Sequence, residues 1–502
     1  MSPVPDWLTP LPDADAMRAT DRWAIEELAI PSLQLMERAG EGLAALVWEV
    51  SATGPAAIVC GRGNNGGDGL VVARLLRRAG RDVRVLLVGD PGELRGDAAA
   101  NLERLPVEAE PFAPERLDGA AVIVDAVLGT GTTGPPREPL LGVIAAMDEA
   151  RTPVVAADVP SGVDASTGAV PGRAVHAAAT ATFAASKPGL WIAPGKSHAG
   201  RVAVVDIGIP DGAPVQTAAG LIGEAVLALV PRRDAAGTKF TSGHVIVAGG
   251  SRGLTGAPTL AALGAMRAGA GYVTVLAPGS EQPVLAIKLT EAMTRALPDR
   301  AGHHVPHGAD AVLEATQRGG ALVLGPGLGR TDDALAFARD VARRAEVALV
   351  LDADGLNAHA GELESLAARS APTVLTPHAG ELARLLGTDS SDVEAQRLQS
   401  ARDAARRSQA IVVLKGDDTI VATPDGVVAV NPLSAPMLAT AGTGDVLSGV
   451  LGALLSKGMD PFAAAAAGVR LHAAAGRLAG ERVGPDGVIA SDVAAALPAV
   501  LA

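Results

Sequence analysis

Residues 56–79 read AAIVCGRGNNGGDGLVVARLLRRA: an apolar run, a glycine-rich stretch, and then alternating apolar and basic residues. The run Ala56 to Cys60 has the length and composition of a buried strand. A helix from Asp68 to Ala79 would place its apolar side chains on one face, and these are Val71, Val72, Leu75, Leu76 and Ala79. The stretch therefore predicts the strand–loop–helix unit from which parallel α/β sheets are built.

The same alternation continues along the chain in two series. Strands are predicted at 83–88, 121–125 and 153–158, and then at 244–248, 272–276, 321–324, 348–352, 373–375 and 411–414. Between the series, PDGAP at 210–214 interrupts the pattern, and a weak helix is predicted at 221–229. We place the boundary near residue 220. The expected domains are residues 1–218 and 222–502, both of α/β class.

Composition limits the compartment and the partners. The net charge of -13 argues against a nucleic-acid partner, because neutralising phosphates needs basic residues. Cys60 is the only cysteine, which excludes an intramolecular disulfide and favours a reducing compartment. No apolar run reaches the roughly 18 residues of a membrane span, and the first residues do not resemble a secretory signal. We expect a cytoplasmic homo-oligomer that acts on small molecules, not on nucleic acid or membranes.

Two loops of the first half, GRGNNG at 61–66 and GTGTTG at 129–134, fit G-x-G-x-x-G. Such loops bring backbone N–H groups close to a phosphate at a helix start, or simply close a tight turn. A competing interpretation is a dehydrogenase in which Asp90 binds the ribose. The polar run Asn64 to Asp68 argues against it. So do Asp125 and Asp158, because they end two further strands and gather acids at one edge of the sheet.

Five ordered segments of this half resemble the NAD(P)H-hydrate epimerases. They are residues 21–40, NNGGDG at 64–69, DAVLGTG at 125–131, DVPSG at 158–162 and SKPG at 186–189. The resemblance covers about residues 12–210 and implies a Rossmann-like domain that interconverts the C6 epimers of hydrated NADH and NADPH. Inverting C6 requires ring opening or loss of the hydroxyl, so a proton must be moved. The family pattern implies that Asp158 and Lys187 are the catalytic acid–base residues.

The same resemblance implies the remaining contacts of this domain. The substrate would be contacted by Asn64, Asn65, Gly66, Gly67, Asp68, Gly129, Thr130, Gly131, Thr132, Thr133, Gly134, Pro135 and Asp158. A potassium ion would be bound by Asn65, Asp125 and Ser161. All three residues offer oxygen, the donor that a hard cation prefers.

In the second half, ATAGTGD at 439–445 precedes a helix predicted at 446–457. Its glycines would expose backbone N–H groups at the positive end of the helix dipole, an anion site for a phosphoryl group in transfer. Asp445 would then stand where a hydroxyl and a phosphate meet. No G-x-x-x-x-G-K-[ST] sequence occurs, so a P-loop enzyme is excluded.

These residues resemble the Gly-x-Gly-Asp signature of ribokinase-like kinases, in which the aspartate is the general base. Further segments are similar to the nucleotide-dependent NAD(P)H-hydrate dehydratases from about residue 225 onward: GGS at 249–251, GAP at 256–258, GPGLG at 325–329, LDADGLN at 351–357, TPHAGE at 376–381, LKGDDT at 414–419 and IASD at 489–492. The tandem order is that of the bifunctional bacterial repair enzymes.

This second resemblance implies phosphorylation of the C6 hydroxyl of the S hydrate by ADP or ATP, with Mg²⁺ accompanying the nucleotide, followed by loss of phosphate. Asp445 would be the catalytic base. The hydrate would be contacted by Ala257, Gly327, His378 and Asp445, and the nucleotide by Lys415, Gly416, Asp417, Asp418, Thr419 and Gly444. The alternative is a ribokinase-like small-molecule kinase fused to a dinucleotide-binding domain, which would release a phosphate ester.

Three groups of residues receive a purely structural interpretation. The histidines 303, 304 and 307 are expected in a surface loop, because no fourth metal ligand is near them in the sequence. The arginines 74, 77, 78 and 81 are expected on the solvated face of one helix. His378 has an alternative to substrate binding, since a histidine in a Thr-Pro-His turn can hydrogen-bond its own loop.

Overall fold

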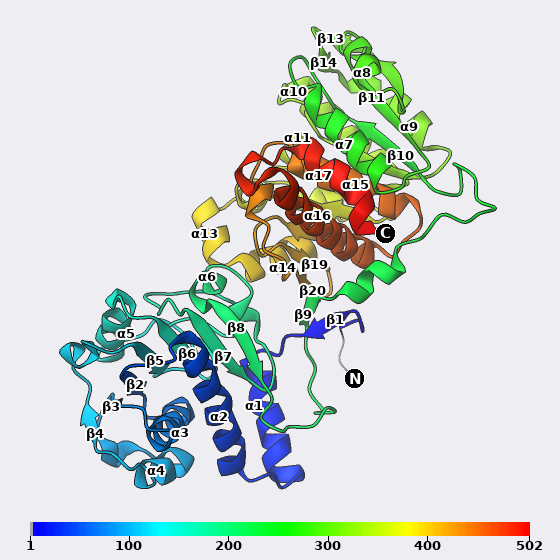
Figure 1. The fold of residues 1–502 in the computed structure, drawn as a ribbon. Helices are drawn as coiled ribbons and strands as arrows, with labels where there is room; N and C mark the ends of the chain where they lie inside the picture. Colours follow the sequence, from blue (N-terminus) through cyan, green and yellow to red (C-terminus); the bar gives the residue numbers. More distant parts are fainter. Residues whose placement is uncertain (1–3, 502) are drawn as a thin grey trace. The chain divides into compact units, whose positions relative to one another are not determined.

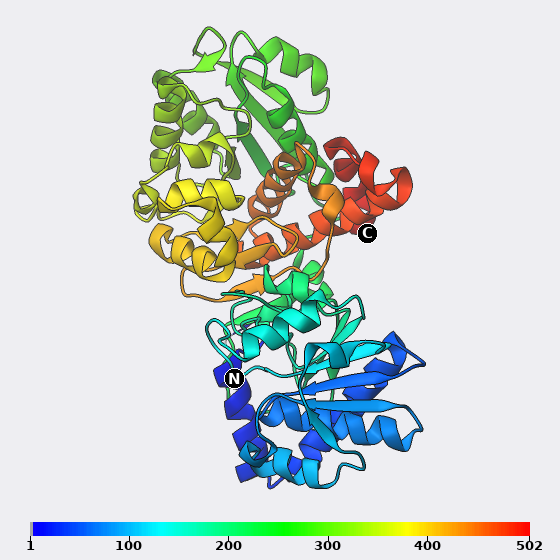
Figure 2. The same ribbon diagram turned by 90° about the vertical axis from the view of Figure 1, so that its left-hand side faces the viewer.

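The computed structural model of the chain describes residues 4–501. They fold into two compact units (Figures 1 and 2). Unit 1 is built mainly from Pro10–Gly220, and unit 2 mainly from Leu221–Glu394 and residues 399–501. Unit 2 also takes in Asp6–Thr9 from the start of the chain. Each unit is an α/β fold with its own sheet.

Unit 1 contains a seven-stranded parallel sheet with the order β4-β3-β2-β5-β6-β7-β8. The strands are β2 (Ala56–Cys60), β3 (Val83–Leu87), β4 (Ala109–Pro111), β5 (Val122–Ala126), β6 (Val154–Ala157), β7 (Ala179–Phe183) and β8 (Arg201–Val205). The chain winds outward first from β2 to β4 and then from β5 to β8, so the order reverses between β2 and β5. In doubly wound sheets this reversal point is where ligands bind.

Helices cover both faces of this sheet. They are α1 (Ala14–Arg22), α2 (Ser32–Val50), α3 (Asn64–Arg78), α4 (Gly96–Glu103), α5 (Leu140–Glu149) and α6 (Gly195–Ala199). Along β2, Ile58 and Cys60 pack with α2 and α3, while Ala57 and Val59 pack with α5. Because both faces are buried, the strand is continuously apolar and lacks the alternation of a half-exposed strand.

Unit 2 contains a sheet with the order β1-β9-β20-β19-β18-β17-β16-β15-β10-β11-β12. It is parallel from β18 to β12, and β18, β19 and β20 pair antiparallel. The strands are β1 (Leu8–Pro10), β9 (Ala219–Ile222), β10 (His244–Ala248), β11 (Tyr272–Pro278), β12 (Met293–Leu297), β15 (Ala321–Leu324), β16 (Ala348–Leu351), β17 (Thr373–Leu375), β18 (Ile411–Leu414), β19 (Ile420–Ala422) and β20 (Val428–Val430). A separate ribbon pairs β13 (Asp299–Arg300) with β14 (His303–His304).

The helices of unit 2 are α7 (Gly256–Arg267), α8 (Gln282–Lys288), α9 (Ala309–Thr316), α10 (Asp332–Arg344), α11 (Asp354–Asn357), α12 (Ala379–Leu386), α13 (Ser390–Ala395), α14 (Arg397–Ser408), α15 (Thr443–Ser456), α16 (Pro461–Val483) and α17 (Ala490–Leu501). Helix α15 packs on α7 and against β10, β15 and β16, so its first turn is held over the sheet. Its glycines allow this approach: a Cβ on Gly449 would lie 1.9 Å from the carbonyl oxygen of Ala261.

Two local expectations are wrong at the join between the units and at the start of α3. Residues 219–222 form strand β9 and Glu224–Leu229 form a 3-10 helix, where one weak helix was predicted at 221–229. Strand β9 is stabilised by the N-terminal segment, since the amide of Gly223 donates to the carbonyl oxygen of Trp7 at 3.0 Å. Helix α3 begins at Asn64, four residues before the predicted Asp68.

Two surface assignments are also wrong. His304 is fully buried on β14, where its ring stacks on Phe337 and its Nε2 lies 3.2 Å from the carbonyl oxygen of Gly249. Arg81 is buried as well, and its guanidinium donates to the carbonyl oxygens of Ser51, Thr53 and Gly54. Long polar side chains bury readily when backbone acceptors satisfy them.

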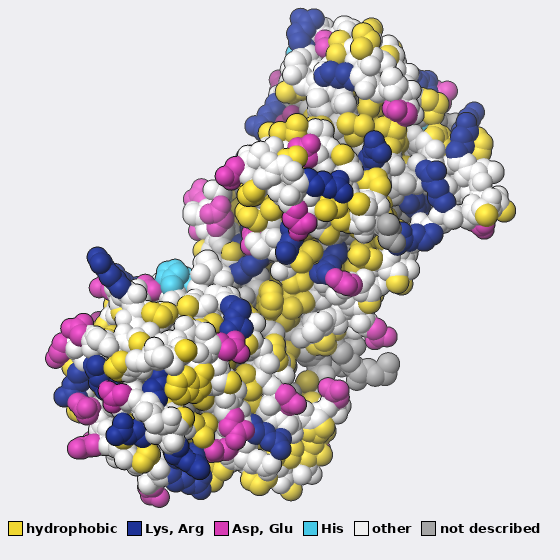
Figure 3. All heavy atoms as spheres, in the orientation of Figure 1, with side chains coloured by type: hydrophobic (Ala, Val, Ile, Leu, Met, Phe, Trp, Pro, Cys, Tyr) yellow, Lys and Arg dark blue, Asp and Glu magenta, His cyan; other side chains and the backbone are white. Residues whose placement is uncertain are grey.

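The surface carries both signs of charge. On the face drawn in Figure 3, Lys and Arg side chains are interspersed with Asp and Glu side chains. Among the helices of residues 4–501, none combines the length and apolar character needed to cross a membrane.

Candidate active sites

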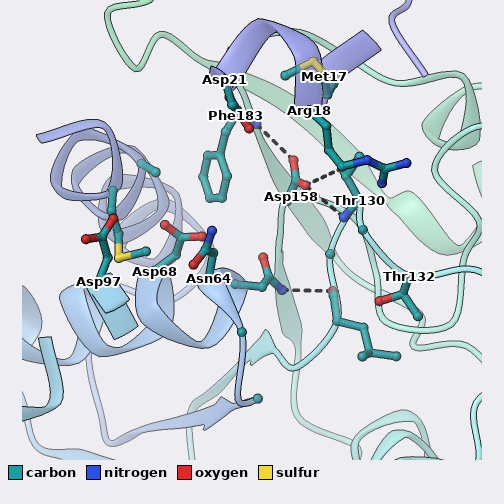
Figure 4. A pocket seen from close by; sticks show the side chains of 18 of the residues that line it. Met17, Arg18, Asp21, Asn64, Asp68, Asp97, Thr130, Thr132, Asp158 and Phe183 are labelled. Atoms are coloured by element: carbon teal, nitrogen blue, oxygen red, sulfur yellow. Dashed lines mark hydrogen bonds between the residues drawn. The ribbon is translucent and has the colours of Figure 1, made fainter. Parts of the chain in front are cut away.

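A cavity of about 620 Å³ opens in unit 1 at the reversal point of the sheet (Figure 4). The loop after β2, the first turn of α3, the loop after β5, the end of β6 and helices α1 and α2 all contribute to its walls. The carboxyl ends of parallel strands therefore converge here, as the cluster of acids at strand ends predicted.

The NNGGD run forms the first turn of α3. A Cβ on Gly66 would lie 1.9 Å from the carbonyl oxygen of Gly61, and one on Gly67 would lie 2.8 Å from the Met36 side chain. Because these glycines have no side chain, the first turn of α3 can pack closely against the loop that follows β2. As a result Asn64, Asn65 and Asp68 line the cavity, while Gly66 and Gly67 lie behind it.

Only part of the second glycine-rich loop reaches the cavity. Residues 129–132 line it, whereas residues 133–135 do not. Gly129 packs against the side chain of Asn65, whose amide donates to the carbonyl oxygen of Leu128 at 2.9 Å. This hydrogen bond joins the two loops at the carboxyl ends of β2 and β5.

Asp158 follows β6 in a strained conformation, with a φ of +66°. A non-glycine residue in the left-handed region costs free energy, and such residues concentrate at functional sites. Its amide donates to the carbonyl oxygen of Ala181 at 2.7 Å, which holds the backbone there. The carboxylate accepts from the amide and the hydroxyl of Thr130 and from the ammonium of Lys187, the last at 2.6 Å.

Lys187 is 1% exposed and its ammonium is fully used by protein acceptors. Besides Asp158, it donates to Thr182 Oγ1 at 2.9 Å and to the carbonyl oxygen of Phe183 at 2.8 Å. Burial alone would raise the pKa of Asp158, but the charge and hydrogen bond of Lys187 and the bonds from Thr130 outweigh it and lower the pKa. Asp158 is therefore a carboxylate at neutral pH.

Asn65, Asp125 and Ser161 are linked into one chain of contacts. The hydroxyl of Ser161 donates to Asp125 at 2.6 Å and its amide to the same carboxylate at 2.8 Å, while the amide of Leu128 donates to the Ser161 hydroxyl at 2.9 Å. Asp125 is fully buried, and burial raises its pKa to about 6 despite these bonds. Oxygen atoms around a buried carboxylate are a donor set that fits a hard monovalent cation.

The second cavity, of about 480 Å³, lies in unit 2 beside the first turn of α15. Lys415, Gly416, Asp417, Thr419 and Gly444 line it, together with His378. Asp418 is buried and does not line it. The loop after β18 is held in place because Thr419 donates to the carbonyl oxygen of Gly416 at 2.6 Å and Ser434 donates to Asp417 at 2.5 Å.

The start of α15 is open toward this cavity. Gly442 has a φ of +91°, which only glycine adopts without strain, and a Cβ there would lie 2.5 Å from the Leu260 side chain. A Cβ on Gly444 would meet only the ammonium of Lys415, at 3.4 Å. The first turn of a helix carries N–H groups that its own carbonyls do not bind. A lysine beside such a turn makes an anion site.

Asp445 lies in a cluster of charges on this turn. Lys415 donates to Asp352 at 3.0 Å and lies 3.7 Å from Glu381, and the Ser448 hydroxyl donates to Asp352 at 2.5 Å. Burial and the charge of Asp352 raise the pKa of Asp445 to about 7, against the opposing charge of Lys415. A carboxyl with a pKa near the working pH suits a general base.

Ala257 and Gly327 are brought together, while His378 stands apart at the cavity. Gly327 has a φ of +63°, and a Cβ there would lie 3.1 Å from that of Ala257. His378 caps α12: its Nδ1 accepts from the amide of Gly380 at 3.0 Å, and Glu381 accepts from the His378 amide at 2.9 Å. The bonding of its own loop, the alternative that the sequence leaves open, is therefore present, and the exposed ring still faces the cavity.

Sequence motifs included Asp352, Glu381 and Asp21 but gave them no role. Asp352 and Glu381 set the charge around Lys415 and Asp445. Asp21, on α1, lines the unit 1 cavity within electrostatic range of Lys187 and Asp158. Asp352 directly follows an apolar strand, a position that could have singled it out; Asp21 and Glu381 lie within helices and carry no such signal.

The fold and the two sites define a class: a Rossmann-like unit with a buried Asp–Lys pair, followed by a ribokinase-like unit with an aspartate in the first turn of a helix that begins at a glycine-rich loop. Residues 32–189 match the family described as YjeF-related protein N-terminus, and residues 245–499 match NAD(P)H-hydrate dehydratase.

The chain is similar along its length to curated proteins named bifunctional NAD(P)H-hydrate repair enzyme Nnr. It is 41% identical to that of Moorella thermoacetica (97% of this chain, 96% of the relative) and 35% identical to that of Escherichia coli (97% and 93%). The chain belongs to this family. A solved ADP/ATP-dependent NAD(P)H-hydrate dehydratase from Bacillus subtilis, co-crystallised with ATP/Mg²⁺, is 31% identical over 55% of this chain and 95% of its own, with a TM-score of 0.47.

Proposed function

We propose that this chain repairs hydrated NADH and NADPH, unit 1 by epimerising C6 and unit 2 by dehydrating the S hydrate with a nucleotide. Residues 1–218 and 222–502 are the two proposed catalytic domains, and the protein acts in the cytoplasm as a homo-oligomer. The observation that carries the proposal is the pairing of two separate sites in one chain. One is the Asp158–Lys187 pair at the cavity of unit 1, and the other is Asp445 beside Lys415 at a helix start.

In unit 1, Asp158 is the ionised carboxylate that handles the proton of the attacking or departing oxygen at C6. Lys187 and Thr130 keep it ionised and fix its orientation. That Lys187 itself moves a proton remains a prediction. The polar residues Asn64 and Asn65 and the backbone of residues 129–132 hold the nucleotide part of the substrate near this carboxylate.

A potassium ion would be held by Asn65, Asp125 and Ser161, where its charge would offset the buried carboxylate of Asp125. Because Ser161 and Leu128 tie this set to the loop after β5, the ion would fix the loop that lines the substrate cavity. Its proposed role is therefore structural: it shapes the site and takes no part in proton transfer.

In unit 2, Asp445 takes the proton of the C6 hydroxyl as the oxygen attacks the terminal phosphorus of ADP or ATP. The ring nitrogen then expels phosphate with the C6 oxygen, and loss of a C5 proton restores the dihydronicotinamide. Lys415 and the first-turn amides of α15 stabilise the charge on the transferred group. Mg²⁺ would enter with the nucleotide, whose phosphate oxygens are ligands of the kind that this ion prefers.

Product analysis tests the proposal against the alternative kinase. Incubation of the chain with S-hydrated NADH and ADP or ATP should release inorganic phosphate and restore the near-ultraviolet absorbance of NADH in equal amounts. Accumulation of a stable phosphate ester without that absorbance would instead support a small-molecule kinase fused to a dinucleotide-binding domain.

A further inference from the structure

Epimerisation needs a proton donor as well as a base, and the geometry of unit 1 leaves Lys187 poorly suited to be the donor. An ammonium has three N–H groups. All three of Lys187 are engaged, by Asp158, Thr182 and Phe183, at distances between 2.6 and 2.9 Å. A proton on Lys187 could reach substrate only if one of these bonds broke inside the protein.

Asp68 offers what Lys187 lacks. It lies on the first turn of α3, is 7% exposed and lines the cavity. Within residues 4–501 its carboxyl has no hydrogen-bond partner and no ion pair, in contrast to Asp158. Figure 4 shows Asp68 and Asp158 projecting from different elements, on either side of the Phe183 ring. Because Asp68 lines the cavity, a bound substrate can reach this carboxyl without breaking a hydrogen bond inside the protein.

The charges around the cavity give the two carboxyls opposite protonation states. Burial raises the pKa of Asp68 well above its usual value, and the charges of Asp158, Asp21 and Asp97 add to the shift, with Lys187 opposing it. Burial and Asp158 also raise the pKa of Asp21, and Lys187 again opposes. Lys187 pairs directly with Asp158, and the other two cations that line the cavity, Arg18 and Arg62, pair with Asp15 and Glu93. Asp158 therefore ionises, and Asp68 retains its proton. Paired carboxyls with separated pKa values are the mark of an acid and a base.

We propose that Asp68 is the general acid of epimerisation and Asp158 the general base, with Lys187 as a positioning residue. The proposal rests on the epimerase activity assigned above. Asp68 gives its proton to the C6 hydroxyl, the C6–O bond breaks, and the departing oxygen leaves as water while the ring nitrogen forms a double bond to C6. A water on the other face then adds to C6 and passes its proton to Asp158. One proton has moved from Asp68 to Asp158, and exchange with solvent resets the pair.

The test is Asp68→Asn in the full-length protein, with the R to S conversion of hydrated NADH followed over a range of pH. An amide keeps the shape of the carboxyl and cannot donate a dissociable proton. We expect kcat to fall on the order of 10²- to 10⁴-fold, with KM changed only a few-fold. The wild-type rate should fall as pH rises through the pKa of Asp68, and this alkaline limb should be absent from the variant.

Three controls make the result decisive. Asp82→Asn changes an exposed aspartate of the same unit and should epimerise at the normal rate. Asp21→Asn removes the neighbouring carboxyl and should keep the alkaline limb. Dehydration of the S hydrate by the same preparation reports that unit 2 is folded, and the melting transition that ADP does not raise reports on unit 1.

Two results would overturn the assignment of Asp68: a raised KM with kcat within about threefold of wild type, or an alkaline limb that survives in Asp68→Asn and disappears in Asp21→Asn. A wild-type protein without any epimerase activity would instead refute the proposed function of unit 1.

Discussion

Replacing Lys187 with methionine removes the one ammonium from a buried site that holds several carboxyls. The change deletes a 2.6 Å bond to Asp158 and leaves Thr182 Oγ1 and the Phe183 carbonyl oxygen without this donor. Methionine has nearly the volume of the lysine stem, so the packing around Pro188 should survive. The loss is therefore mainly electrostatic, and its size follows from burial: Lys187 is 1% and the Asp158 side chain 13% exposed.

Removing one partner of a buried ion pair costs about 3 to 5 kcal/mol. For a unit of roughly 200 residues each kcal/mol shifts Tm by about 2–4 °C, so the unit 1 transition should fall by about 6 to 20 °C. The pH dependence should also reverse. In the wild type the pKa of Asp158 is lowered, so its contribution to stability is present above the unfolded-state pKa and is lost as pH falls through the folded value.

Without Lys187, burial raises the pKa of Asp158, and the variant should lose stability as pH rises through that value. Calorimetry of the intact protein at about pH 5 and pH 8, with and without ADP, measures both effects. The transition that ADP does not raise is assigned to unit 1. Lys196→Met is the matched control from the same unit. An equal, small loss of Tm at both pH values would refute the electrostatic account of this pair.

Three further predictions concern the other sites. Asp445→Asn should lower the rate of nucleotide-dependent dehydration on the order of 10²- to 10⁴-fold and leave epimerisation unchanged. In the wild type the dehydration rate should rise with pH near 7, the pKa of Asp445. A near-normal dehydration rate in the variant would mean that Asp445 only shapes the helix start. Asp125→Ala should abolish any potassium dependence of epimerisation without affecting dehydration, and an epimerase indifferent to potassium in both proteins would remove this ion from the account. Residues 1–218 and 222–502, expressed separately, should each keep one activity, but the second fragment should melt below the corresponding transition of the whole chain. It lacks β1, most of β9 and Trp7, whose carbonyl oxygen accepts from the amide of Gly223 and whose ring lies 5.2 Å from that of Phe462. Equal melting temperatures would show that these segments contribute nothing.

The sheet cores followed from sequence because their strands are buried on both faces. Short and mainly apolar runs gave β2, β10, β15, β17 and β18 with their observed ends. Strand β1 is three residues long and ends in proline, so no periodicity marks it, and its stability comes from β9, more than 200 positions away. The weak apolar pattern at 221–229 could not distinguish a short edge strand and a 3-10 turn from one helix.

The positions of the proposed catalytic carboxyls were predictable from the sequence, and their protonation states were not. Strand ends and glycine-rich turns located Asp158 and Asp445 because such positions converge at one edge of a parallel sheet. Burial raises the pKa of Asp68, and the charges of Asp158 and Asp21 add to the shift while Lys187 opposes it. These three residues lie on three other segments. Likewise, the saturation of Lys187 is set by Thr182 and Phe183 of β7. Protonation states that depend on charges from distant segments cannot be predicted from the spacing of residues in the sequence.

The central claim is that one chain joins an epimerase to a nucleotide-dependent dehydratase, and a single recovery assay tests it. An equal mixture of R- and S-hydrated NADH is incubated with ADP or ATP, and the return of NADH absorbance is followed for the wild type and for Asp158→Asn. The wild type should recover nearly all of the mixture, whereas Asp158→Asn should rapidly recover only about the S half. Recovery limited to the S half in the wild type, or complete and equally fast recovery in Asp158→Asn, would contradict it.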